Sequence, residues 1–225
     1  MKIQILGSDS AFDGLNTSFW FVDKSGGGVN SRGVLVDCGF TVFPELVRRG
    51  ILNDVDVVLI SHLHADHTGS LCTLGVKRRL QGKKITVGGT DVSELFKVQG
   101  VLPDDFIPLA DDDPLNVKTI RTGHIPQYGS NNALFIANSI LYSGDSNESV
   151  LNTEYARQAK IIIHEAVLNL SYAHTGIELL NAAAPEIKAK TWLTHIPTEE
   201  RAEIERLAPQ LGFAGVCYNG QEIEV

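Results

Sequence analysis

The chain has few of the features that secreted, membrane-spanning or disulfide-bonded proteins require. Its three cysteines, at positions 38, 72 and 217, are scattered and form no CxxC pair. Such a set excludes a disulfide framework and is typical of buried thiols in a reducing compartment. No apolar run approaches the roughly 20 residues that cross a membrane. Because residues 1–7 run straight into a strand-like alternation without a signal-peptide core, we expect a cytoplasmic protein with no membrane partner.

Basic charge is also scarce. Lysine and arginine number 19 against 27 aspartate and glutamate residues, which gives a formal net charge of −8. Long nucleic acids are bound largely through neutralisation of their phosphates, so they are not an expected partner. A local basic pocket for one or two phosphates is compatible with this charge. With 225 residues, 43% of them hydrophobic, and no internal repeat, we expect one domain over residues 1–225.

Short apolar segments alternate with helix-like segments along the chain. Two segments, Asp91 to Glu94 and Thr175 to Glu178, have the spacing of a helix-starting capping box. This interleaving indicates an α/β layered fold. The expected strands are residues 2–6, 19–22, 34–37, 55–60, 85–88, 117–122, 133–137, 140–143, 160–163, 190–194 and 216–218. The expected helices are residues 45–49, 69–80, 91–99 and 151–159, and two that start near positions 175 and 198.

A dense histidine cluster follows the apolar run of residues 55–60. Three of the seven histidines, with one aspartate, fall between His62 and His67. A tight loop can aim His62 and His64 at one point, while Asp66 and His67 diverge toward a second point nearby. Neutral imidazole and carboxylate are the ligands that a divalent transition metal prefers. A solvated polar loop is the alternative, but it does not account for the clustering of so few histidines.

The motif His62-x-His64-x-Asp66-His67 resembles the HxHxDH signature of metallo-β-lactamase-fold hydrolases. In that family the first two histidines bind one metal ion and the Asp–His pair binds a second. Further ligands follow in order, each at a strand end: a histidine, a bridging aspartate and a last histidine. The matching residues here are His124, Asp145 and His195. The resemblance covers nearly the whole chain and implies a metallo-β-lactamase αββα sandwich.

The resemblance implies a two-metal site of seven ligands. The first ion would be held by His62, His64 and His124, and the second by Asp66, His67 and His195, with Asp145 as the bridge. Two cations about 3.5–4 Å apart share a water, lower its pKa and direct a metal-activated hydroxide at an electrophile. Asp66 is therefore expected among the catalytic residues as well. Zinc is the expected metal, with manganese or iron as alternatives, because His/Asp sites accept all three.

A second element narrows the reaction. Residues 161–166, which end in His164-Glu165-Ala166, and His174 resemble the HEA…H pattern of the ribonuclease Z branch. In that branch the histidine lies near the departing oxygen and the carboxylate orients it. His174 on an exposed turn can protonate an alkoxide leaving group, and Glu165 on its second ring nitrogen would raise its pKa. A structural histidine is the alternative for His174. We interpret His164 as a strand-end surface residue.

The spacing of the ligands bears on the substrate. Ribonuclease Z carries a long tRNA-gripping arm between the positions that match His124 and Asp145, whereas this chain has only 21 positions there (145 − 124 = 21). The combination resembles small phage-type (anti-Pycsar) cyclic-nucleotide phosphodiesterases, so a cyclic nucleotide is the expected substrate. The alternatives are a tRNA 3′-end endonuclease, a hydrolase of another bond such as a lactone, thioester or β-lactam, and a non-enzymatic binding module.

The same resemblance implies a homodimer, and we expect part of one chain to cover the site of its partner. One candidate cover is the glycine-rich loop from Asp23 to Arg32, although its composition favours a flexible surface loop over a covering flap. The favoured candidate is the segment from Val101 to Pro114, where Leu102, Phe106 and Ile107 are apolar residues in acidic surroundings. The alternative is that these residues pack on their own domain.

Overall fold

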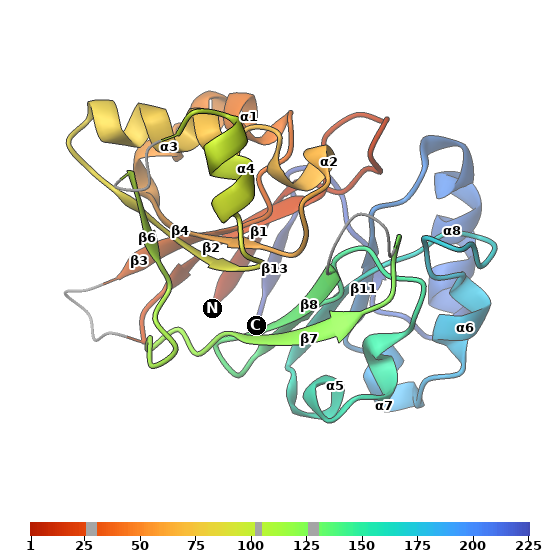
Figure 1. The fold of residues 1–225 in the computed structure, drawn as a ribbon. Helices are drawn as coiled ribbons and strands as arrows, with labels where there is room; N and C mark the ends of the chain where they lie inside the picture. Colours follow the sequence, from red (N-terminus) through yellow and green to blue (C-terminus); the bar gives the residue numbers. More distant parts are fainter. Residues whose placement is uncertain (26–30, 102–104, 126–130) are drawn as a thin grey trace.

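Two β-sheets face each other in the computed structural model, and helices cover their outer faces (Figure 1). The structure describes residues 1–25, 31–101, 105–125 and 131–225. Within this part of the chain the first sheet has seven strands, in the order β13-β1-β2-β3-β4-β5-β6. Their bounds are β1 (Lys2–Gly7), β2 (Ser18–Asp23), β3 (Arg32–Val36), β4 (Val55–Ile60), β5 (Ile85–Gly89), β6 (Phe106–Pro108) and β13 (Glu222–Glu224).

The second sheet has the order β12-β11-β10-β9-β8-β7. Its strands are β7 (Lys118–Thr122), β8 (Asn131–Ile136), β9 (Ile140–Tyr142), β10 (Ile161–Glu165), β11 (Thr191–Thr194) and β12 (Gly215–Val216). The strands β9, β10, β11 and β12 run parallel to one another, as do β3, β4, β5 and β6 in the first sheet. Each sheet therefore gathers the carboxyl ends of several strands at one edge.

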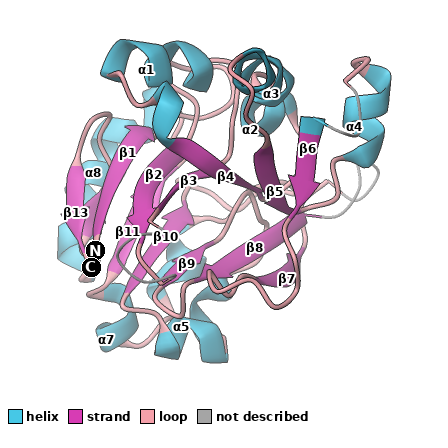
Figure 2. Ribbon diagram, turned by 90° about the vertical axis from the view of Figure 1, so that its left-hand side faces the viewer, coloured by secondary structure: helices cyan, strands magenta, loops and turns pink. Residues whose placement is uncertain are grey.

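Helices close the two outer faces (Figures 1 and 2). Over the first sheet lie α1 (Val42–Arg49), α2 (Ala65–Thr68), α3 (Leu71–Leu80) and α4 (Ser93–Val98). Over the second sheet lie α5 (Glu154–Gln158), α6 (Ile177–Asn181), α7 (Pro185–Lys188) and α8 (Thr198–Leu211). The single-turn 3₁₀ helices η1 (Leu52–Asp54) and η4 (Val150–Asn152) complete the described elements. Helix, sheet, sheet and helix layers form the expected αββα sandwich. No helix within the described residues combines the length and apolarity needed to span a bilayer.

The buried strands are apolar on both faces because each face meets a different core. In β4, Val57 and Leu59 pack between the sheets, whereas Val58 and Ile60 pack under the helices of the first sheet. Alternate side chains of a strand point to opposite faces, so a strand covered on both sides has an almost continuous apolar sequence. The same division explains the isoleucine run of β10. This packing holds the ends of β4 and β10 rigidly where the site lies.

Most of the expected elements are present, with local corrections. The segment from 133 to 137 begins earlier, at Asn131, and α1 begins at Val42, before the expected start at residue 45. Neither capping box forms. The residue before α4 is Val92, and Asp91 accepts hydrogen bonds from the backbone N–H and hydroxyl of Ser93. The residue before α6 is Gly176. Thr175 does not cap this helix, because its hydroxyl donates to the carbonyl of Ser146 at 2.5 Å.

Candidate metal centre

The HxHxDH motif begins where β4 ends and continues into α2, as expected. Ser61 fixes the turn, because its backbone N–H and hydroxyl both donate to the Asp37 carboxylate at 2.8 Å. His64 is the extended residue before α2, so Asp66 and His67 lie on the helical turn that follows. A Cβ at Gly39 would overlap the carbonyl oxygen of Asp66, so only glycine permits this close approach of the β3–α1 loop. The motif is thus held between two buried strands and a loop that touches its backbone.

The structure brings together all seven residues expected as metal ligands. They form two groups, and within each group one ligand atom per residue lies within 4.8 Å of the others. One group is His62, His64, His124 and Asp145; the other is Asp66, His67, His195 and Asp145. Asp145 belongs to both groups: its Oδ1 lies 3.3 Å from His67 Nε2 of the second group, and its Oδ2 lies 3.8 Å from His124 Nε2 of the first. Its position fits the bridging role.

The positions of Asp145 and His195, the last two candidate ligands along the chain, depend on left-handed backbone conformations. His195 has a φ of 55°, in the left-handed region that residues other than glycine rarely adopt, and Gly144 beside Asp145 has a φ of 56°. For a residue other than glycine, such as His195, this conformation costs of order 1–3 kcal/mol, and such residues are concentrated at functional sites. Here they re-aim the chain at the ends of β11 and β9, so that His195 and Asp145 converge on one point.

Several polar atoms of the cluster are buried without a hydrogen bond. They include His62 Nε2, Asp66 Oδ2, His67 Nε2 and Asp145 Oδ1. Buried polar atoms are normally paired, so an unpaired set that faces one point requires another partner. Imidazole nitrogens and carboxylate oxygens in such a set fit divalent metal ions.

The electrostatics of the cluster agree with this fit. Burial lowers the pKa of His62 well below its usual value, which keeps the ring neutral and able to bind a metal. Burial alone would raise the pKa of Asp145, but the surrounding histidines lower it well below its usual value. Burial likewise lowers the pKa of His67, yet the carboxylates of Asp145, Asp66 and Asp37 outweigh burial and raise it. Three buried carboxylates around one ring mark a place that favours positive charge.

Asp37 supports the cluster from behind. Its Oδ2 accepts from the Nδ1–H of His67 at 2.7 Å and from the hydroxyl of Tyr142 at 2.9 Å, in addition to the hydroxyl of Ser61. This fixes the ring of His67 with Nε2 turned into the cluster. Tyr142 was not predicted from the sequence as part of this support. The only local signal for Tyr142 was a polar group at the end of the apolar strand before Asp145.

Asp37→Asn is therefore expected to weaken metal binding by about 10- to 100-fold, the usual effect of losing a partner of a metal-binding histidine. The amide would replace one acceptor with a donor that faces the His67 N–H. Competition with a chromogenic chelator measures this affinity. Tyr142→Phe removes only one of the donors to Asp37 and should change the affinity far less. An unchanged affinity in Asp37→Asn would show that His67 needs no such support.

His174 and Glu165 lie beside the cluster, as expected. Glu165 is fully buried, and its Oε2 lies 2.6 Å from Nδ1 of His174, while its Oε1 accepts from the backbone N–H groups of Ser146 and Thr175. Together with Asp145 and His195 they form a third group of convergent ligand-type atoms. Burial lowers the pKa of His174, but the hydrogen bond and charge of Glu165 raise it to about 9. The hydrogen bond to Glu165 therefore favours the protonated form of His174 at the edge of the site.

Loop contacts set the position of His174. The His174 ring lies 5.5 Å from that of His195 and 5.3 Å from that of His124, between ring centroids. The carbonyl of Ala173, the residue before it, accepts from Nδ1 of His124 at 2.6 Å. The loop that carries His174 thus also turns Nε2 of His124 into the cluster. A shift in this loop would move the rings of His124 and His174 together.

The interpretation of His164 as a surface residue was wrong. Its side chain is fully buried, its Nδ1 donates to the carbonyl of Glu165 at 2.8 Å, and its Nε2 accepts from the N–H of Val150 at 3.3 Å. Burial lowers its pKa to about 4, so the ring is neutral. His164 is a structural residue that ties the end of β10 to η4.

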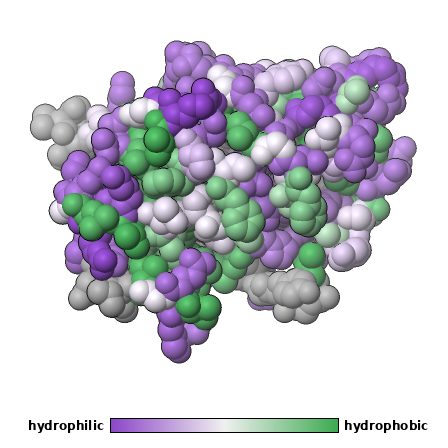
Figure 3. Space-filling view, turned by 90° about the horizontal axis from the view of Figure 1, so that it is seen from above, coloured by the Kyte–Doolittle hydropathy of each residue, from purple (hydrophilic) through white to green (hydrophobic). Residues whose placement is uncertain are grey.

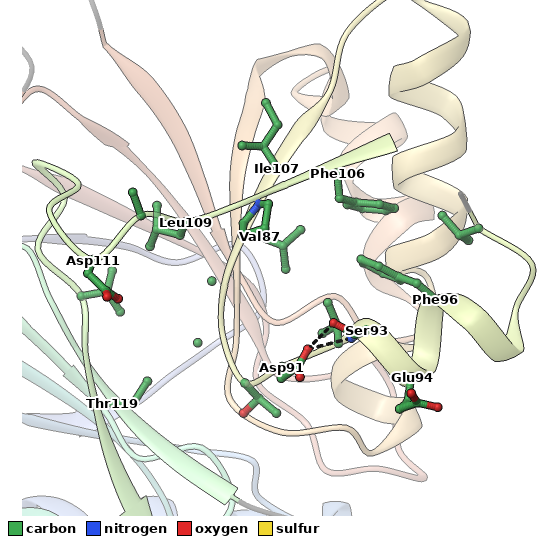
Figure 4. A pocket seen from close by; sticks show the side chains of 18 of the residues that line it. Val87, Asp91, Ser93, Glu94, Phe96, Phe106, Ile107, Leu109, Asp111 and Thr119 are labelled. Atoms are coloured by element: carbon green, nitrogen blue, oxygen red, sulfur yellow. Dashed lines mark hydrogen bonds between the residues drawn. The ribbon is translucent and has the colours of Figure 1, made fainter. Parts of the chain in front are cut away.

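In the segment expected to cover a partner's site, Phe106 packs on its own domain. Phe106 is buried and stacks on Phe96 with 3.9 Å between ring centroids, whereas Ile107 is exposed (Figure 4). Both line a cavity of about 1100 Å³ beside β5, α4 and β6, and none of the seven candidate ligands lines it. Leu102 lies outside the described residues, as do residues 26–30 of the glycine-rich loop. The apolar residues of β6 thus complete the edge of the first sheet.

Comparisons with known proteins agree with the fold. The metallo-β-lactamase-fold protein YhfI from Bacillus subtilis superposes with a TM-score of 0.76 at 19% identity, covering 99% of this chain and 98% of that one. The short form of human tRNase Z, ELAC1, superposes with a TM-score of 0.70 at 16% identity, covering 100% of this chain and 99% of that one. At these identities the likeness establishes the fold alone. This chain therefore has the metallo-β-lactamase fold.

Sequence comparison identifies the family. A curated relative, the anti-Pycsar protein Apyc1 of Paenibacillus sp. (strain J14), is 28% identical over 222 residues, which cover 87% of this chain and 89% of that protein. The sequence profile of the family described as anti-Pycsar protein Apyc1 matches residues 1–88 and 83–222. The chain thus belongs to the anti-Pycsar protein Apyc1 family.

Proposed function

We propose that this protein is a metal-dependent hydrolase that cleaves the phosphodiester bond of cyclic nucleotides, as anti-Pycsar enzymes would do to destroy an immune signal. The observation that carries the proposal is the convergence of seven ligand-type residues in two groups that share Asp145. The His174–Glu165 pair at 2.6 Å lies beside these groups and adds a proton donor. Membership of the Apyc1 family supports the same substrate class.

The residues present fit two divalent metal ions, one in each group. His62, His64 and His124 would hold the first, Asp66, His67 and His195 the second, and Asp145 both. When bound, such ions lower the pKa of water and neutralise charge that develops on a phosphoryl oxygen. We propose zinc as the metal, with manganese or iron as alternatives that the same ligands accept.

The chain's own groups account for departure of the leaving oxygen. Cleavage of a cyclic phosphodiester frees an alkoxide, which is a poor leaving group unless it is protonated as the bond breaks. His174 carries a proton at neutral pH because Glu165 raises its pKa to about 9. Two backbone N–H groups donate to the Glu165 carboxylate and hold it in place. The carboxylate accepts a hydrogen bond from Nδ1 of His174 and thereby orients the ring. The Nε2–H of His174 is then free to meet the leaving oxygen.

Other bonds and larger substrates are less compatible with these features. Asp145 follows His124 by 21 positions, and the described part of this stretch consists mainly of β8 and β9. That leaves no room for a tRNA-gripping arm, and the net charge of −8 disfavours a long polyanion. A lactone or β-lactam hydrolase would have no evident need for the buried Glu165–His174 pair.

We extend the proposal to the domain organisation, the oligomeric state and the cellular location. Both sheets contribute residues to one site, and β13 at the end of the chain pairs with β1 at its start, which supports one domain over residues 1–225. The homodimer expected from the resemblance belongs to the proposal, and so does a cytoplasmic location, which three free buried cysteines support.

Turnover of a substrate panel tests the proposal. Metal-loaded protein would be given 3′,5′- and 2′,3′-cyclic nucleotides, cyclic dinucleotides and a precursor tRNA, and the products would be separated by chromatography. We expect linear nucleoside monophosphates from at least one cyclic mononucleotide and no processing of the tRNA. Cleavage of the tRNA at its 3′ end, with every cyclic nucleotide intact, would replace the proposed function with that of a tRNA endonuclease.

A further inference from the structure

Exposed aromatic rings are concentrated at one end of the molecule. Among the described residues, the exposed aromatic side chains are Phe12, Phe40, Tyr172 and Tyr218. They follow β1, β3, β10 and β12, and these strands all end at the edge of the sandwich where the ligand cluster lies. Exposed aromatic rings occur nowhere else in the part of the chain that the structure describes, although hydrophobic residues are scattered over the face in Figure 3.

Phe12 stands out because its ring touches nothing while its loop is firmly held. Its side chain is 101% exposed, relative to a free residue. The carboxylate of Asp9 accepts from the N–H of Leu15 at 2.8 Å, and that of Asp13 accepts from the N–H of Thr198 at 3.1 Å. Thr198 follows His195 by three residues, so this loop borders the second ligand group. Because the ring is fully exposed, a ligand that packs against it would gain the free energy of burial.

Phe40 borders the same ligand group from the first sheet. A Cβ at Gly69 would overlap the Phe40 ring, so the ring rests on the residue that ends α2, the helix that carries Asp66 and His67. Its side chain is nevertheless 59% exposed. The loops of Phe12 and Phe40 are joined through Asn16, whose side-chain amide donates to the carbonyl of Ala11 and whose Oδ1 accepts from the N–H of Thr41.

Tyr172 lies on the opposite side, at the turn that carries the proton donor. The N–H of Ser171 donates to the carbonyl of His174 at 3.0 Å, which closes a tight turn with Tyr172 at its tip. The side chain of Asn147 donates to the Tyr172 carbonyl at 2.8 Å and anchors this turn to the loop after Asp145. The ring itself is 76% exposed. Aromatic rings therefore border the cluster from both sheets.

We propose that Phe12, Phe40 and Tyr172 form a stacking surface for the nucleobase of the substrate. This inference rests on the proposed function. The metal ligands and His174 act on the phosphate and leave the base without a binding group, while exposed rings on hydrogen-bonded loops suit the faces of a base. Stacking tolerates different bases, since every base presents a π face. Tyr218 is left out because it follows β12, the edge strand of the second sheet.

Three alanine variants test this role: Phe12→Ala, Phe40→Ala and Tyr172→Ala. For a cyclic nucleotide we expect KM to rise about 5- to 150-fold in at least two of them, the range for loss of one stacking partner, with kcat changed far less. For ribose 3′,5′-cyclic phosphate, which has no base, KM should stay within about twofold of the wild type, since no stacking is lost. Phe12→Trp and Phe40→Trp keep an aromatic ring at each position, so they should bind the cyclic nucleotide tightly. Calorimetric titration of a cyclic nucleotide into each variant measures affinity independently of turnover.

Leu80→Ala is the matched control. Leu80 is 75% exposed but ends α3, which leads away from the cluster toward the start of β5, so KM should not change. If the wild type hydrolyses cyclic nucleotides and all three aromatic variants keep its KM, the stacking surface is refuted and the proposed function stands. If the variants keep KM but sedimentation shows a wild-type dimer dissociating, the rings belong to a subunit interface and the inference is overturned. If the wild type neither binds nor hydrolyses any cyclic nucleotide, both proposals fall.

Discussion

Asp145→Ala is expected to abolish turnover and to remove one or both metal ions. Asp145 is the only residue in both ligand groups: its Oδ1 lies 3.3 Å from His67 Nε2 of one group, and its Oδ2 lies 3.8 Å from His124 Nε2 of the other. Loss of a partner behind a ligand already costs about 10- to 100-fold in affinity, so loss of a bridging ligand should cost more than 100-fold. Elemental analysis of the purified variant, beside steady-state rates, measures both effects.

The fold should survive this change, because the apolar clusters on either face of each sheet do not include Asp145. Circular dichroism of the variant provides that check. Asp112→Ala is the control, since Asp112 is an exposed aspartate in a loop outside the site. Two metal ions per chain together with wild-type rates in Asp145→Ala would exclude Asp145 as the bridge.

His174→Ala should lower kcat for a cyclic nucleotide by about 10²- to 10⁴-fold, the usual contribution of general acid catalysis, while the metal content stays unchanged. Bis(p-nitrophenyl) phosphate should be affected much less, because p-nitrophenolate leaves without a proton. Rates for both substrates, measured on the same preparation, separate proton delivery from binding. Equal losses on the two substrates would assign His174 to binding or structure.

Glu165→Gln is the companion to this variant. The amide keeps the shape of Glu165 but removes the negative charge that raises the pKa of His174. It should therefore reduce the rate with the cyclic nucleotide and spare the activated substrate, in the same pattern as His174→Ala. A pattern opposite to that of His174→Ala would separate the two residues into independent roles.

The candidate site was largely predictable because its residues form recognisable patterns in short stretches of sequence. A histidine and aspartate cluster directly after a continuous apolar strand can face only one edge of the sheet, and His124, Asp145 and His195 also follow strand-like runs. The structure places all of them together. The support behind them was harder to predict. Tyr142 reaches Asp37 across 105 positions of sequence, and only the packing of the two sheets makes them neighbours.

Several features could not be predicted because they depend on partners that are distant in the sequence. Phe106 is buried because Gly75 on α3 has no side chain: a Cβ there would overlap the Phe106 ring. Nothing near Phe106 in the sequence reveals this space. The capping box at Thr175 fails for a similar reason, since its hydroxyl binds the loop after Asp145 in preference to the helix that follows. Strand β13 was missed because three residues have little pattern of their own and are ordered by pairing with β1.

Turnover of a cyclic nucleotide as a function of metal content tests the central claim most directly. Protein stripped by a chelator and dialysed would receive zinc or manganese in steps, and the hydrolysis rate would be recorded at each step with the bound metal measured in parallel. Our account predicts no turnover in the stripped protein and full activity at two ions per chain. Full activity in the stripped protein, or no hydrolysis of any cyclic nucleotide at two ions per chain, would contradict it.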